Sequence, residues 1–170
     1  MTTASTASAT IETSKAAGRR ELNFTTLDEA IADANRLAAA EREGRLHRLG
    51  NWSFGQNLGH LAAWVNYSFD GLPMTVPWFV RLPMRFFKNK VLNSKMRPGS
   101  RIPGISGGTL GIEPLSSEEG LERFNKAFSR LKAGSPALPH ALFGRLTHEE
   151  WIKQHLRHAE LHLSFMRAAE

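Results

Sequence analysis

Three of the seven histidines lie close together near the C-terminal end of the chain, in the sequence WIKQHLRHAELHL. His158 and His162 are four residues apart, and His155 precedes His158 by three residues. On a helix these spacings place the imidazoles on one face, within roughly 60° of arc, and Trp151 continues the same stripe. A row of imidazoles is poor material for a hydrophobic core, because every ring brings nitrogens that need partners. Neutral imidazole is the commonest metal ligand in proteins, so the stripe predicts half of a metal site.

A second stretch of the chain offers a further ligand. His60 lies in a predicted helix and follows Gly59, which permits the close approach of another helix. His60, His158 and His162 would form an open-faced site for one divalent ion, with zinc, nickel and iron as the candidates. Water or substrate would fill the remaining positions. The alternative is that these are surface or partly buried histidines that bind no metal, and the spacing alone does not decide between the two.

Four residues near these histidines could take part in the site or have a purely structural place. His155 could be a ligand, a residue behind the ligands or a proton carrier, or it could be a neutral histidine on the helix surface. Gln56 could hydrogen-bond a ligand or a bound water, or it could cap the start of its helix. Trp64 and Trp151 could line the pocket, or they could belong to the core.

Other ionisable residues are predicted to lie outside the site. Glu160 is about 160° from His158 around the helix and points away from the stripe, so we predict that its side chain is solvated. Three histidines show no paired spacing and are expected in loops or on the surface: His47, His140 and His148.

The composition narrows the chemistry. The chain has 170 residues and no cysteine, so thiolate zinc sites and cysteine nucleophiles are excluded, and a metal must be held by His, Asp, Glu or water. Motifs of dinucleotide, P-loop, serine-hydrolase and zinc-protease sites are missing from the sequence. No apolar run is long enough for a transmembrane helix, and the N-terminus lacks the apolar region of a signal peptide. We therefore expect a cytoplasmic protein.

The basic balance raises the question of anionic partners. A net charge of +6 is compatible with nucleic acid, an anionic membrane or an anionic substrate, and equally with a mildly basic soluble protein. The basic residues form no repeated or groove-reading motif, which argues against nucleic acid.

Four helices are expected, because Ser or Thr is followed three residues later by Glu or Gln at four places, which is the spacing of a capping box. The predicted helices cover approximately residues 27–43, 53–70, 117–132 and 147–166. No stretch reads as a convincing strand, so the predicted fold class is all-α, a four-helix bundle. Residues 1–20 are rich in Thr, Ser and Ala and are expected to form a disordered tail, which leaves 21–170 as the folded domain.

Residues 72–116 form a long irregular connection, broken by six prolines and five glycines. Within it, residues 78–92 are predicted to form one or two short amphipathic helices, with basic residues between aromatic ones. Connections of this length inside a domain are usually functional, and this one predicts a crossover between the second and third helices. We expect a lid whose aromatic residues pack on the bundle. The alternative is that residues 78–97 lie on an anionic membrane or dock a partner protein.

Three motifs together suggest a family: WSFGQNLGHLA at 52–62, FGRLTHEEW at 143–151, and three histidines in the spacing HxxHxxxHL at 155–163. Over roughly residues 20–167 the chain resembles a branch of the DinB-like (YfiT-like) superfamily called domain of unknown function 1569 (DUF1569). The resemblance implies a four-helix bundle with a crossover, frequent dimerisation and a three-histidine divalent-metal site. The ligand positions would fall on His60, His158 and His162.

The resemblance also suggests an activity. Characterised relatives in the superfamily include metal-dependent thiol transferases and a mycothiol-dependent isomerase. The 72–116 connection has no counterpart in the small thiol transferases, so their substrates are not expected to carry over. The first hypothesis is therefore a metal-dependent hydrolase or thiol transferase, expected as a homodimer, in which the ion activates a water or a thiol. The second is a non-catalytic module that binds through residues 78–97.

Overall fold

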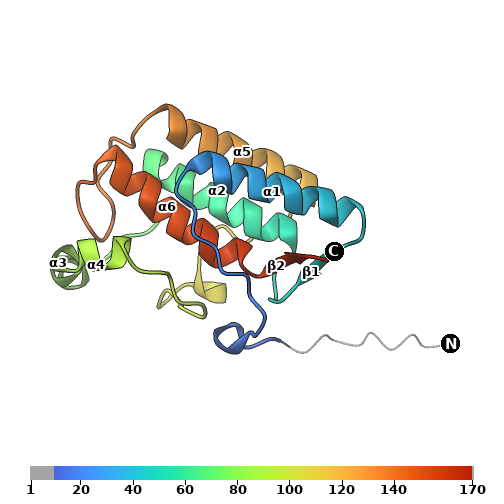
Figure 1. Cartoon of the computed structure of the whole chain (residues 1–170). Helices are drawn as coiled ribbons and strands as arrows, with labels where there is room; N and C mark the ends of the chain where they lie inside the picture. Colours follow the sequence, from blue (N-terminus) through green and yellow to red (C-terminus); the bar gives the residue numbers. More distant parts are fainter. Residues whose placement is uncertain (1–9, 170) are drawn as a thin grey trace.

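The structure, a computed structural model, describes residues 10–169 and is mostly helical (Figure 1). The four long helices are α1 (Leu27–Arg42), α2 (Phe54–Asp70), α5 (Ser117–Ala133) and α6 (His148–Leu163). The connection from α2 to α5 contains α3 (Trp78–Phe86), α4 (Lys88–Leu92) and a 3-10 turn at Ser106–Gly108, and a further 3-10 turn lies at Thr13–Lys15. Among residues 10–169, no helix combines the length and the apolar character that crossing a bilayer would take.

The long helices begin at capped N-termini. The caps of α1, α2 and α6 are full capping boxes, as predicted from the sequence. At α5, the Ser116 side chain accepts a hydrogen bond from the Glu119 N–H, but the Glu119 carboxylate pairs with Arg123 instead of returning to the cap. The expected box at α5 is therefore only half formed, because a nearby guanidinium competes for its carboxylate.

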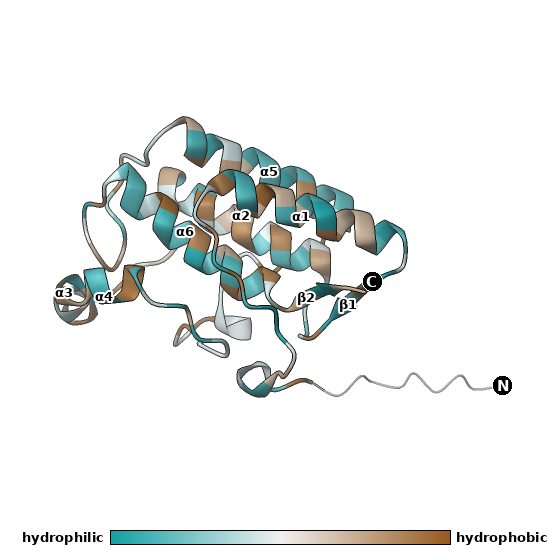
Figure 2. Ribbon diagram, in the orientation of Figure 1, coloured by the Kyte–Doolittle hydropathy of each residue, from teal (hydrophilic) through white to brown (hydrophobic). Residues whose placement is uncertain are grey.

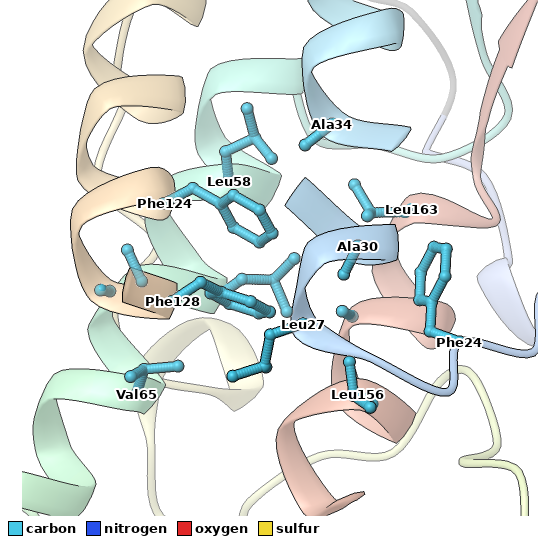
Figure 3. Close-up of a cluster of buried hydrophobic side chains, with 14 of the residues drawn as sticks. Phe24, Leu27, Ala30, Ala34, Leu58, Val65, Phe124, Phe128, Leu156 and Leu163 are labelled. Carbon is cyan, nitrogen blue, oxygen red and sulfur yellow. The ribbon is translucent and has the colours of Figure 1, made fainter. Parts of the chain in front are cut away.

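The core lies between the four long helices, where α1 and α2 each contact α5 and α6. Figure 3 shows Phe124 and Phe128 of α5 pointing toward α1, where Leu27 lies beside Phe128. All three side chains are buried, and the two phenylalanine rings stack with their centroids 4.0 Å apart. The long helices carry hydrophilic and hydrophobic residues in alternation (Figure 2), as expected for helices with one buried face.

Glycine lets α2 approach the start of α5. A Cβ on Gly55 would lie 2.4 Å from the carbonyl oxygen of Leu115, and a Cβ on Gly120 would lie 2.6 Å from the carbonyl oxygen of Gly55. The close helix approach predicted at Gly59 is not made by a helix: the Leu115 side chain of the connection lies there, and its Cδ1 would lie 2.4 Å from a Cβ. The end of the long connection is thereby seated against the turn of α2 that carries the predicted metal ligand.

A two-stranded antiparallel sheet joins the segments that follow α1 and α6. It consists of β1 (Leu46–Arg48) and β2 (Met166–Ala168), with His47 opposite Arg167. The prediction of an exclusively α-helical chain is therefore wrong in this detail. Strands of three residues are too short to show the alternating pattern by which strands are recognised in a sequence.

The segment before α1 is held against the C-terminal part of the chain. Arg20 forms a two-pronged ion pair with Asp33 of α1 and also donates to backbone carbonyls at the end of α6 and in β2. Arg19 donates to the Ser164 hydroxyl at 2.7 Å. Residues 19 and 20 are therefore bound to the folded part of the chain, although the predicted domain begins at residue 21. Their long guanidinium side chains reach acceptors that are distant in sequence. Residues 1–9 lie outside the described residues, so the disordered tail stays a prediction there.

The two short helices of the connection differ in how they are held. In α4, Leu92 is buried and Lys88 pairs with Glu150 of α6 at 2.6 Å. The aromatic side chains of α3 are exposed. The prediction that the aromatic residues of this segment pack on the bundle is therefore wrong for α3.

Candidate metal centre

Three histidines from two helices converge in the interior. His60 comes from α2, and His158 and His162 come from successive turns of α6. One ligand nitrogen from each ring lies within 4.8 Å of the others, and the Nε2 atoms of His60 and His158 are 3.1 Å apart. Two ligands of a tetrahedral ion with metal–nitrogen distances of about 2.1 Å lie about 3.4 Å apart. The cluster could therefore hold a metal ion.

In two of the rings, the Nδ1 atom is hydrogen-bonded to an oxygen. His60 Nδ1 lies 2.8 Å from the Leu110 carbonyl oxygen, and His162 Nδ1 lies 3.2 Å from Asn57 Oδ1. Asn57 is itself oriented, because its Nδ2 donates to the Ser53 carbonyl at 2.8 Å. Both oxygens can only accept, so both histidines carry their proton on Nδ1 and present the Nε2 lone pair. Metal-binding histidines are typically held in this way.

His158 is held by another histidine. Its Nδ1 is buried and has no hydrogen-bond partner within residues 10–169. Since His60 Nε2 can only accept, the bond between the two Nε2 atoms requires His158 Nε2 to donate. A metal ion bound to both Nε2 atoms would replace this hydrogen bond.

Burial keeps the three imidazoles neutral. It lowers the pKa of His60 to about 4, although the hydrogen bond to Leu110 acts in the opposite direction. Burial, and then the neighbouring histidines, lower the pKa of His158 well below the usual value. Burial, and then His60 and Arg19, do the same to the pKa of His162. Neutral imidazole is the form that binds metal, so near neutral pH the cluster is in its ligand state.

Two tryptophans flank the cluster. Trp52 stacks on His162 with ring centroids 5.3 Å apart and meets His60 edge-on at 5.0 Å. Trp64 lies edge-on to His60 at 6.0 Å and to His158 at 5.8 Å. Trp64 was one of the predicted pocket residues, whereas Trp52 was not. Trp52 precedes the helix, so no helical spacing links it to His60. Its position as the first residue of the WSFGQNLGH motif was the only sign in the sequence that it belongs near the cluster.

Trp151 and His155 belong to a neighbouring cluster. The Trp151 ring stacks on His155 at 5.9 Å and meets His140 at 5.2 Å. His155 is buried, and its Nε2 lies 2.9 Å from Ser68 Oγ. Ser68 donates its own proton to the Trp64 carbonyl, so it accepts from His155. His155 is therefore buried against Trp151 and Ser68, and it is not the surface histidine that was the alternative.

The hydrogen bonds of Gln56 and His140 show what each side chain does in the structure. Gln56 accepts from the Ser53 N–H at 2.9 Å and donates to the Ile112 carbonyl, so its hydrogen bonds are those of a helix cap and of the connection. His140 lies in a loop, as predicted, but it is half-buried, and its Nδ1 accepts from two backbone N–H groups. Burial lowers its pKa to about 4.

The prediction that Glu160 is solvated is wrong. The residue is only 5% exposed. One carboxylate oxygen accepts from the Phe24 N–H at 2.7 Å, and the other pairs with Arg157 at 2.7 Å. The segment that leads into α1 covers this face of α6, and helix periodicity cannot reveal such a covering.

Acidification is expected to destabilise the metal-free protein. The pKa of His140 is lowered to about 4 and that of His155 to about 3, in each case mainly by burial. Stability from such groups is present above the unfolded-state pKa of about 6.5 and is lost as the pH falls toward the folded-state value. Between pH 7 and pH 5 each group should remove about 2 kcal/mol from the free energy of unfolding.

Urea unfolding of chelator-treated protein at the two pH values measures this loss. His155→Phe keeps an aromatic ring against Trp151 but cannot titrate, so the drop should shrink by about 2 kcal/mol. Stability that is unchanged or higher at pH 5 would contradict the assignment of buried, neutral histidines.

Comparisons with known proteins give one match. A family model described as protein of unknown function (DUF1569) matches residues 16–169, which include all three histidines of the cluster. No curated protein and no solved structure matches the chain.

Proposed function

Because the chain belongs to the DUF1569 family and brings His60, His158 and His162 together, we propose that these three side chains bind one divalent metal ion. The observation that carries the proposal is the orientation of the rings. His60 and His162 each give their Nδ1 proton to an oxygen, so the lone pair of each ring is on Nε2. A bound ion would take the place of the hydrogen bond that His60 Nε2 accepts from His158. Such an arrangement is the one by which proteins prepare histidine for metal.

The fold supports a wider relationship. We infer that α1, α2, α5 and α6 form a four-helix bundle of the DinB-like type, with residues 71–116 as the crossover between its second and third helices. The contacts among the four helices support this assignment, as does the placement of one ligand on the second helix and two on the last. A homodimer and a cytoplasmic location, both expected from the sequence, stay predictions.

The donor set limits the metal and the chemistry. Three neutral imidazoles suit zinc, nickel or iron, and three protein ligands leave room for water or substrate. When bound, the ion would act as a Lewis acid that activates a water or a thiol, as a hydrolase or a thiol transferase requires. Trp52 and Trp64 pack against the rings, while the Leu110 carbonyl and Asn57 hold two of them in place.

His155 has a supporting role in this proposal. Its Nε2 proton is given to Ser68, which in turn bonds the Trp64 carbonyl one turn earlier in α2. That chain of hydrogen bonds ties α6 to the helix that carries His60. The predicted role of His155 as a proton carrier stays untested.

Metal titration tests the proposal. The full chain, stripped with a chelator and carrying no histidine tag, is titrated with Zn²⁺, Ni²⁺ and Fe²⁺ by calorimetry, with Fe²⁺ kept under anaerobic conditions. We expect one ion per chain for at least one of these metals. Absence of stoichiometric binding of all three would overturn the proposal.

Replacing Asn57 with leucine should weaken metal binding without removing a ligand. The change removes the acceptor that orients His162, and loss of a supporting residue of this kind typically costs about 10- to 100-fold in metal affinity. The matched control is Asn35→Leu at an exposed position of α1, which should leave the affinity unchanged. Equal affinity of the Asn57→Leu variant and the parent chain would show that Asn57 does not orient a ligand.

A further inference from the structure

The connection between α2 and α5 carries the positive charge of the molecule. Residues 71–112 contain seven Lys and Arg and no Asp or Glu. The remaining residues therefore hold 15 Lys and Arg against 16 Asp and Glu, so they are close to neutral. The net charge of +6 therefore comes from residues 71–112, and this segment is where an anionic partner would bind.

Within this region α3 exposes an apolar face. At about 100° per residue, four apolar side chains fall within about 100° of arc. They are Trp78, Phe79, Leu82 and Phe86. Trp78 is 73% exposed and Phe86 is 81% exposed, whereas aromatic residues of a soluble domain are usually covered. Phe87, just after the helix, is exposed as well.

Basic side chains flank this face. Arg85 and Arg81 lie about 20° and 60° from Trp78 on the side of the helix away from Phe79. Lys90 follows on α4 and is exposed, while Lys88 is used in the ion pair with Glu150. An aromatic face with basic residues along its edge is the pattern of helices that lie in the interface of a membrane.

The position of α3 suits a flat partner. Figure 1 shows α3 and α4 together at the end of the molecule away from β1 and β2. Among the long helices, α6 contacts α4 and forms the Lys88–Glu150 ion pair with it, whereas α3 mainly contacts α4. The apolar face of α3 is therefore not covered by a long helix, so it can meet a surface without rearrangement of the core.

We propose that α3 docks the protein on an anionic membrane surface. Trp78, Phe79, Leu82 and Phe86 enter the interface, and Arg81, Arg85 and Lys90 lie at the level of the lipid phosphates. The absence of acidic side chains from residues 71–112 removes the repulsion that would oppose such a surface. The proposal is independent of metal binding at the histidine cluster.

Vesicle flotation of the full chain tests this surface. Vesicles of phosphatidylcholine alone are compared with vesicles that also contain phosphatidylglycerol, at about 50 mM and about 500 mM salt. We expect binding to the anionic vesicles at low salt and a reduction of at least about tenfold at high salt or without the anionic lipid. No binding at low salt, or equal binding to both lipids at both salt concentrations, would overturn the proposal.

Two double variants separate the contributions of the face. Trp78→Ser with Phe86→Ser removes apolar area, and Arg81→Glu with Arg85→Glu reverses charge. Each should lower binding at least about tenfold. The charge control is Arg42→Glu with Lys126→Glu, which makes the same change in net charge at exposed positions of α1 and α5 and should retain binding.

Sedimentation of the same variants distinguishes a second occupant. If the serine variant changes the mass of the protein from dimer to monomer but leaves vesicle binding intact, the face belongs to a second copy of the chain and the membrane proposal fails. An equal loss of vesicle binding in the charge control would also overturn the membrane proposal. Binding would then depend on the net charge of the protein and not on the basic residues of α3.

Discussion

His158→Ala is expected to abolish stoichiometric metal binding. The variant retains His60 and His162 but loses the ligand whose Nε2 lies 3.1 Å from that of His60. Two imidazoles on different helices form a much weaker site than three. The loss of affinity should therefore exceed the 10- to 100-fold typical of a supporting residue. Metal analysis after dialysis against limiting Zn²⁺ should give less than about 0.1 ion per chain.

The matched control for this change is His47→Ala. His47 is an exposed histidine on β1 and belongs to no cluster with His60, so its replacement should leave the metal content at one ion per chain. Circular dichroism of both variants without metal should match that of the parent, which separates loss of the site from loss of the fold. An unchanged metal content in His158→Ala would show that the ion binds elsewhere.

Glu160→Ala is expected to destabilise the protein by about 3–5 kcal/mol. The Glu160 and Arg157 side chains are only 6% and 14% exposed, so removal of the carboxylate leaves a guanidinium poorly solvated and unpaired. It also removes the acceptor of the Phe24 N–H. Breaking one partner of such a pair costs more than the pair itself contributes, because the remaining charge stays buried. Urea unfolding of the two chains measures the difference.

Two comparison variants sharpen this experiment. Glu160→Gln keeps an oxygen that can accept from the Phe24 N–H and should be less destabilising than Glu160→Ala. Glu149→Ala, at an exposed position of the same helix, should change stability by less than about 0.5 kcal/mol. A loss of less than about 1 kcal/mol in Glu160→Ala would indicate that the N-terminal segment does not cover α6.

The long helices were predictable because their signals are local. Capping residues and helical periodicity marked α1, α2, α5 and α6 to within a few residues, since both depend on neighbours in sequence. The same periodicity placed His158 and His162 on one face of α6. The small sheet escaped prediction because three-residue strands form only once α1 and α6 have brought their ends together.

The supports of the cluster were less predictable than its histidines. Leu110 lies fifty residues from His60 in sequence, and its carbonyl carries no side-chain signal. Asn57 stands one turn before His60, but its interpretation depends on knowing that α6 lies opposite. Trp52 depends on the path of the chain before α2. Each of these contacts arises from tertiary packing, which a single sequence does not encode in any local pattern.

Two errors share one physical origin. Glu160 was expected to be solvated, and the aromatic residues of the connection were expected to be covered. The chain does the reverse at both places, because the segment before α1 lies over α6 while α3 extends away from the bundle. Hydrophobicity and periodicity predict which face of a helix is suited to burial. Whether that face is buried depends on which other segments of the chain lie over it.

A crystal structure of the chelator-treated, zinc-loaded chain, with anomalous diffraction recorded at the zinc edge, tests the central claim most directly. The account predicts one anomalous peak per chain, about 2.0–2.1 Å from Nε2 of His60, His158 and His162. It also predicts that His60 and His162 keep their Nδ1 hydrogen bonds to Leu110 and Asn57. A peak at other residues, or no peak between α2 and α6 in zinc-loaded crystals, would contradict the proposed metal site.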